Sequence, residues 1–136
     1  MSVYRDWVWD DNITLYHQAK SKDANGKTEV TWTRSVLGDC FYGRKVQRAI
    51  SGDEIVSTNT HIVRIPVSSV SAGFALSNGD IIVKGDVSDT IPKNDSGSSL
   101  RAKYPDNCFV VNAVVDNTKL PKTAHWYAAE DLWEDL

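Results

Sequence analysis

Stretches in which apolar and polar residues alternate, or β-branched residues run together, follow one another along the whole chain. Residues 13–19 alternate in the manner of a half-buried strand. Asn25-Gly26 predicts a hairpin turn after them, because this pair tolerates the positive φ angles that such turns require. Further strands are predicted at residues 28–35, 39–44, 54–57 and 61–66, and Pro66 should end the last of them or mark it as an edge strand.

The strongest pattern lies in the second half of the chain. Residues 78–86 and 108–117 each hold a β-branched run bounded by turn residues, which predicts two buried antiparallel strands. The Ser-rich residues 68–77 predict a short helix or a loop. Residues 89–104 form a polar connection that is too long for a simple hairpin.

These elements predict a mainly all-β fold, a small antiparallel β-barrel or sandwich with long loops and extended terminal arms. A chain of 136 residues suits one domain with a modest core. We therefore expect a single β-barrel domain over residues 1–136, which includes an N-terminal arm at residues 1–11 and an acidic, aromatic tail at residues 129–136.

Charge and composition exclude some classes of protein. A net charge of -3 argues against a surface that wraps nucleic acid, because that affinity comes from Lys and Arg neutralising phosphates. The N-terminal residues hold no apolar run typical of a targeting segment, and no apolar run approaches the ~20 residues that span a bilayer. We expect a soluble protein with no membrane partner, in which Cys40 and Cys108 are free, buried thiols.

No residues predict catalysis or the binding of a metal or cofactor. His17, His61 and His125 do not stand at zinc-site spacings from one another or from the cysteines. Phosphate-binding loops, dinucleotide-binding glycine patterns and nucleophile elbows are absent from the sequence. The prediction is a protein that is not an enzyme and has no cofactor.

Two groups of basic residues fall at predicted loops or hairpin tips. They predict either transient contact with DNA phosphates or an acidic partner, or else ordinary solvated hairpins. The residues are Arg44, Lys45 and Arg48 in the first group, and Lys93, Arg101 and Lys103 in the second.

Large apolar side chains gather at both ends of the chain. They either pack back onto the domain or anchor it to a subunit or partner, since exposed aromatics leave a sticky surface. The candidate interface residues are Tyr4, Trp7 and Trp9 near the start, and Leu132, Trp133 and Leu136 near the end.

Between about residue 12 and residue 128 the order of short motifs resembles that of small tailed-phage neck proteins. These are the head-completion (head–tail connector) and minor capsid proteins of phages and prophages of Gram-positive bacteria. The matching pieces are Ile13-Thr14-Leu15-Tyr16, Trp32, Cys40-Phe41-Tyr42-Gly43-Arg44-Lys45, Ser51-Gly52-Asp53-Glu54-Ile55-Val56, Val63-Arg64-Ile65-Pro66, Gly79-Asp80-Ile81-Ile82-Val83-Lys84-Gly85, Phe109-Val110-Val111, Val114-Val115-Asp116-Asn117 and His125-Trp126-Tyr127.

The resemblance implies a structural protein made in the host bacterial cytoplasm and placed in the virion, at the head–tail junction. About twelve copies would form a ring below the portal protein, since repeated heterologous contacts close into rings. The ring would extend the DNA channel, help retain packaged DNA with transient contact to the duplex, and dock the tail or the next neck protein. Loops at residues 44–53 and 89–103 would reach the channel or a neighbouring ring.

Two other interpretations stay open. One is a tail-terminator or tail-completion ring protein, which is also small and rich in β structure. The other is a monomeric carbohydrate-binding or ligand-binding β-module, in which Trp32 or Trp126 would stack on sugar rings.

Overall fold

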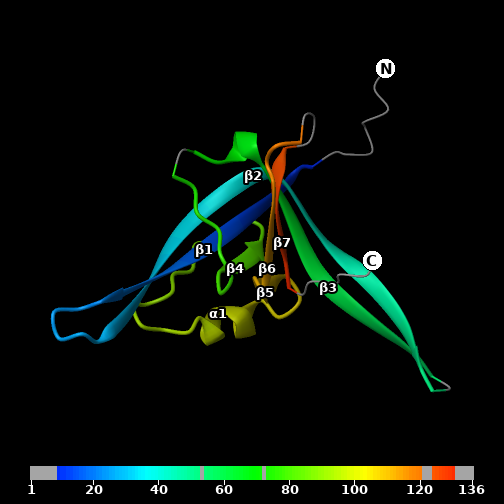
Figure 1. The fold of residues 1–136 in the computed structure, drawn as a ribbon, viewed down its shortest axis with the longest axis horizontal. Helices are drawn as coiled ribbons and strands as arrows, with labels where there is room; N and C mark the ends of the chain where they lie inside the picture. Colours follow the sequence, from blue (N-terminus) through cyan, green and yellow to red (C-terminus); the bar gives the residue numbers. More distant parts are fainter. Residues whose placement is uncertain (1–8, 53, 72, 121–123, 131–136) are drawn as a thin grey trace.

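The computed structural model describes residues 9–52, 54–71, 73–120 and 124–130, with the backbone alone described within 45–51 and 54–59 (Figure 1). Its elements in chain order are β1 (Asp11–Lys22), β2 (Thr28–Ser51), β3 (Glu54–Pro66), the 3₁₀ turn η2 (Val67–Ser69), β4 (Ile81–Lys84), α1 (Ser98–Lys103), β5 (Cys108–Val110), β6 (Ala113–Asn117) and β7 (His125–Ala129). Asp11 and Ala129, which the sequence assigned to the arms, thus belong to strands.

All strand pairs are antiparallel, and the order in the single sheet is β5-β4-β1-β2-β3-β7-β6. The mainly β fold is confirmed. Closure into a barrel is not: in the part of the chain that the structure describes, edge strands β5 and β6 do not pair with each other. Only Val111 and Asn112 separate these two strands, so the backbone passes directly from one edge of the sheet to the other.

Strand β2 is the longest element and belongs to both halves of the sheet. Its first part pairs with β1 and its second part with β3. The sequence predicted a break near Gly38-Asp39, yet the strand continues through a register shift opposite Asp11 and Ile13. Asp39 has a φ of 56°, so the extra residue bulges and bends the strand instead of ending it.

The two hairpins that share β2 leave the body in different directions (Figure 1). The β1–β2 hairpin turns at Asn25-Gly26, as predicted, and Gly26 has a φ of 79°. The connection after β4 supports this hairpin, since Asn94 exchanges backbone and side-chain hydrogen bonds with Val30 and Asp95 O accepts one from Trp32 Nε1 at 2.8 Å.

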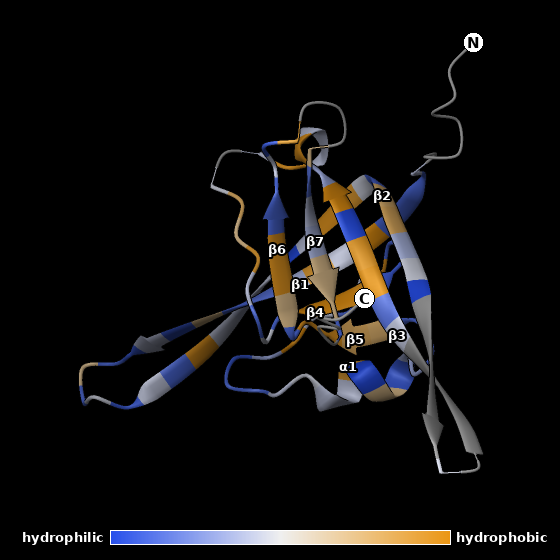
Figure 2. Ribbon diagram, turned by 45° about the vertical axis from the view of Figure 1, so that its right-hand side comes forward, coloured by the Kyte–Doolittle hydropathy of each residue, from blue (hydrophilic) through white to orange (hydrophobic). Residues whose placement is uncertain are grey.

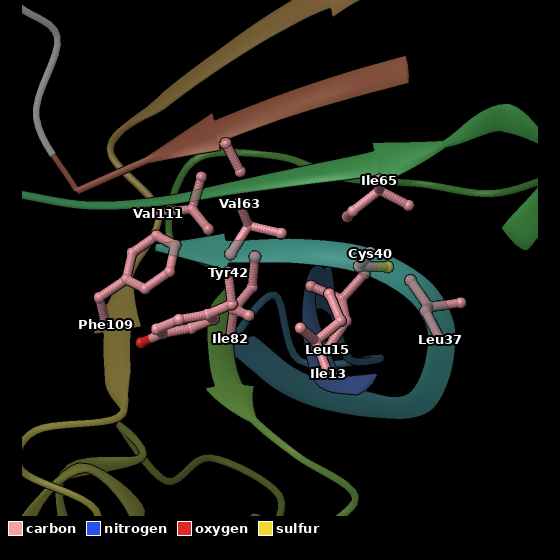
Figure 3. Close-up of a cluster of buried hydrophobic side chains, with 11 residues drawn as sticks. Ile13, Leu15, Leu37, Cys40, Tyr42, Val63, Ile65, Ile82, Phe109 and Val111 are labelled. Atoms are coloured by element: carbon pink, nitrogen blue, oxygen red, sulfur yellow. The ribbon is translucent and has the colours of Figure 1, made fainter. Parts of the chain in front are cut away.

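The main core lies between the two halves of the sheet (Figure 3). Alternate residues of β3 explain its composition, because Val63 and Ile65 are fully buried while Arg64 lies on the opposite face, and orange and blue alternate along this strand in Figure 2. The cluster contains Ile13, Leu15, Leu37, Cys40, Tyr42, Val63, Ile65, Ile82, Phe109, Val111 and Ala128. Burying each large aliphatic side chain contributes about 1.5–3 kcal/mol.

The polar connection at residues 89–104 is ordered and contains a helix, which the sequence did not predict. Ile91 and Leu100 are buried in a second cluster with Tyr16, Ile81 and Val83. Leu100 is the buried residue of α1 and anchors the helix to this cluster. No helix among the described residues has the length and apolar character needed to cross a membrane.

Candidate functional site

The face of β2, β3, β7 and β6 that points away from the main core carries a row of large side chains. Phe41 pairs with Arg64, Arg64 with Tyr127, and Tyr127 with Val115, so these residues lie side by side across four strands. We call these residues the outer row. They alternate with Tyr42, Val63, Ala128 and Val114, which pack in or against the main core.

Arg64 lies between two aromatic rings of the outer row. Its guanidinium carbon is 5.4 Å from the centre of the Phe41 ring and 5.3 Å from the centre of the Tyr127 ring. Cation–π contacts of this kind hold the guanidinium flat against the sheet. The long side chain therefore forms part of a fixed surface.

A small apolar cluster fills the space beside the outer row. It consists of Ile62, Ala113 and Ala129, with Phe41 and Tyr127 packed against it. The Phe41 ring lies over Gly43, where an added Cβ would come within 2.5 Å of Phe41 Cζ. The outward face thus presents Phe41, Arg64 and Tyr127 half-buried and Val115 exposed, a combination of aromatic and Arg side chains typical of protein interfaces.

The same sheet extends into a two-stranded ribbon, residues 44–51 of β2 and 54–61 of β3. The β3–β7 register ends at Ile62, and Glu130 N adds one more hydrogen bond to His61 O at 3.0 Å. In the described part of the chain, no other strand pairs with residues 44–51 or 54–60. At the usual rise per strand residue, the residues of each ribbon strand give the ribbon a length of about 25 Å.

The predicted basic residues do not form one cluster. Arg44 is exposed, and its Nη2 donates to Asp106 O at 2.7 Å. Lys93 pairs with Glu29 at 3.1 Å beside the first hairpin, and Arg101 lies on α1. Lys45 and Arg48 lie in β2 opposite Thr60 and Ser57, where the structure describes the backbone alone. The expected loop at residues 44–53 is instead strand up to Ser51.

Lys103 has its own carboxylate partner. Its Nζ lies 2.7 Å from Asp89 Oδ2, and the Tyr104 hydroxyl donates to Asp89 Oδ1 at 2.7 Å. The hydrogen bond from Lys103, then that from Tyr104, lowers the pKa of Asp89, and the bond to Asp89 raises the pKa of Lys103. This lysine is thus already neutralised locally, which weakens the case for it as a DNA contact.

Of the predicted interface residues, the structure places Trp9 alone. Its half-buried ring meets the buried His125 ring edge-on, with 5.3 Å between centres and 80° between planes. For Trp9 the contact is therefore with the chain's own β7. Tyr4, Trp7, Leu132, Trp133 and Leu136 lie outside the described residues.

The residues considered for sugar stacking, thiol chemistry and metal binding do not form a common site. Trp32 packs against the second cluster and Trp126 against the main core, so they do not share one sugar-stacking platform. Cys40 and Cys108 are free and buried, as predicted, and desolvation raises their pKa to about 12 and about 11. Within the described residues, no three potential metal ligands gather.

Sequence reasoning missed the outer row. Arg64 and Tyr127 stand in predicted strands, but which residues of β2 and β7 flank β3 depends on strand order. The available signal was the alternation at residues 63–65, in which Arg64 lies between Val63 and Ile65 and therefore on the opposite face from them.

Comparison with known proteins gives one family. Neither the curated proteins nor the solved structures include a match to this chain. Residues 8–129, from the approach to β1 through the end of β7, match a family described as "Family of unknown function (DUF6751)", and the chain belongs to this family.

Proposed function

We propose that this protein is a structural virion protein of the neck of a tailed phage, which forms a ring below the portal. The ring extends the DNA channel, helps retain packaged DNA and docks the tail. The single observation that carries the proposal is the β2–β3 ribbon, which leaves the sheet beside the outer row and pairs with no third strand in the described chain.

Stability gives the reason why a ribbon of this kind indicates assembly. A two-stranded hairpin in water is at best marginally stable and needs a third strand or a packed face. The ribbon of one subunit would obtain that support from the next copy. A contact between the ribbon of one copy and a different surface of its neighbour is heterologous, and such contacts generate rings when the rotation closes.

The outer row is the surface that we assign to the neighbouring subunit. It begins at the base of the ribbon, at Phe41 and Arg64, and ends at the exposed Val115 of edge strand β6. Side chains of this kind carry most of the binding energy in many interfaces. The motif order described above supports the placement of the ring in a phage neck.

Charge favours the same function. The net charge of -3, and the ion pairs that Lys93 and Lys103 form with Glu29 and Asp89, leave a subunit without a strong attraction for phosphates. DNA could then slide through the channel without being held.

The test replaces outer-row residues in the full chain and measures ring formation on portal-bearing capsids. We expect Tyr127→Ala and Arg64→Glu to abolish the ring while the free subunit keeps its circular dichroism spectrum. Arg34→Glu is the matched control, because Arg34 is an exposed arginine of the other half of the sheet, paired with Asp86. Rings formed equally well by Tyr127→Ala, Arg64→Glu and the parent protein would rule out the outer row as the subunit contact.

A further inference from the structure

A pocket of about 570 Å³ lies where the sheet stays open. Its lining includes Cys108, Phe109 and Val110 of β5, Arg101 of α1, and Asn112 and Glu130. All of β5 thus borders the pocket, and β5 is an edge strand that pairs only with β4 among the described strands. An edge strand exposes backbone groups that a further segment of chain can meet, so the pocket has room for an occupant at this edge.

Glu130 makes the chain leave the sheet at the rim of this pocket. A continued ladder would direct the His61 amide to the carbonyl of residue 130. Instead the Glu130 carboxylate accepts that amide at 3.2 Å, and the Glu130 carbonyl accepts a hydrogen bond from Asn112 Nδ2 at 3.0 Å. The described chain therefore ends beside Asn112, itself a residue of the pocket.

A buried hydroxyl next to the pocket also lacks a partner. Tyr42 is 6% exposed, and its hydroxyl makes no hydrogen bond to the described residues. The hydroxyl lies close enough to Cys108, Arg44 and Glu130 to interact with them electrostatically. Buried hydroxyls in proteins nearly always have a partner, so a polar group from outside the described residues is expected to meet this hydroxyl.

We propose that residues 131–136 of the same chain dock in this pocket. Their sequence, Asp131-Leu132-Trp133-Glu134-Asp135-Leu136, offers apolar side chains for the β5 side and carboxylates for Arg101 and Tyr42. Six residues span at most about 20 Å, and this segment begins at the rim. Its short tether gives it a high effective concentration at the pocket. Docking requires one subunit only, so it is independent of ring formation.

Cys108 reports on the occupant, because Cys108 is among the residues that line the pocket, whereas Cys40 lies in the main core and does not line it. Iodoacetamide labelling of both thiols is followed by peptide mass spectrometry in the full chain, in a chain ending at Glu130, and in Trp133→Ala. We expect truncation and Trp133→Ala to speed Cys108 labelling about tenfold, the ratio for docking favourable by about 1.4 kcal/mol. Cys40 labelling stays constant if the fold is intact.

The matched control is Lys119→Glu, an exposed change outside the pocket, which leaves the Cys108 rate unaltered. Equal Cys108 rates in the full chain, the truncated chain and Trp133→Ala would overturn the proposal. Protection that appears only as protein concentration rises would overturn it as well, because the occupant would then be a second copy. If truncation also accelerates Cys40 labelling, the truncated chain has lost part of its fold. The Cys108 labelling rates of the full chain and of Trp133→Ala then decide between the two outcomes.

Discussion

The buried Asp80 and the partly exposed His17 form a pair that joins the turn before β4 to β1. The Asp80 side chain is fully buried, and its Oδ2 lies 2.9 Å from His17 Nδ1. The same carboxylate accepts the backbone amides of Gln18 and Ser77, each at 2.9 Å. A buried carboxylate with several donors is well satisfied, and removing it leaves those donors without a partner.

Replacing Asp80 should therefore destabilise the fold strongly. We expect Asp80→Ala to lower the free energy of unfolding by about 2–4 kcal/mol, measured from the urea midpoint at an unchanged slope. Asp86→Asn is the control, because Asp86 is 62% exposed, and it should change stability by less than about 0.5 kcal/mol. A loss of similar size in both variants would contradict the structural role of the Asp80–His17 pair.

Gly97 and Gly26 make a matched pair for a test of packing. Both have positive φ, 81° and 79°, but a Cβ at Gly97 would lie 2.5 Å from Ile81 Cδ1, whereas nothing lies within 4 Å at Gly26. Alanine should cost about 1 kcal/mol at Gly26 from backbone strain. At Gly97 it should cost about 1–3 kcal/mol more from overpacking. Thermal unfolding of the two alanine variants measures these losses of stability. Equal losses at Gly97 and Gly26 would refute the tight contact beneath α1.

Alkylation of the cysteines should depend steeply on pH. Burial raises the pKa of Cys108 to about 11 and that of Cys40 to about 12. Only the thiolate reacts, so each rate should rise about tenfold per pH unit between pH 7 and 9 without a plateau. A plateau near pH 9 for Cys108 in the folded protein, followed by mass spectrometry, would show an ordinary exposed thiol instead.

Hydrogen exchange should separate the ribbon from the body. Amides at residues 45–50 and 55–59 should exchange fast in the free subunit, since a two-stranded ribbon opens easily. Amides at residues 81–83, in β4 between β1 and β5, should exchange slowly. On assembly the ribbon amides should gain protection while those of β4 stay unchanged. Slow exchange of the ribbon in the free subunit would remove the stability argument for assembly.

Local pattern was enough to predict β1, the Asn25-Gly26 turn, the end of β3 at Pro66 and the presence of strands β4 and β5. Each depends on a few adjacent residues whose turn chemistry or alternation acts locally. The pattern could not predict that residues 108–117 split into β5 and β6, because one polar residue, Asn112, does not by itself end a strand and only the sheet order assigns the two parts to opposite edges.

The candidate site was predicted less well than the fold. The sequence left open whether the aromatics at the chain ends pack back onto the domain or form an interface. Trp9 packs against His125, and the outer row lies in mid-strand. Arg64 has a ring on each side because β2 and β7 flank β3, and that arrangement joins residues far apart in sequence. The alternation around Arg64 indicates its face of the strand, but long-range pairing leaves no local signal that identifies its neighbours on β2 and β7.

The central claim is that copies of this protein form a ring at the head–tail junction. Negative-stain imaging of the full chain mixed with portal-bearing empty capsids from the same genome tests it most directly, with isolated tail tubes in a parallel sample. We predict an added ring at the portal vertex, lost in Tyr127→Ala. Bare portal vertices together with capped tail tubes would contradict the neck assignment in favour of tail completion, and binding to neither would contradict a structural role at this junction.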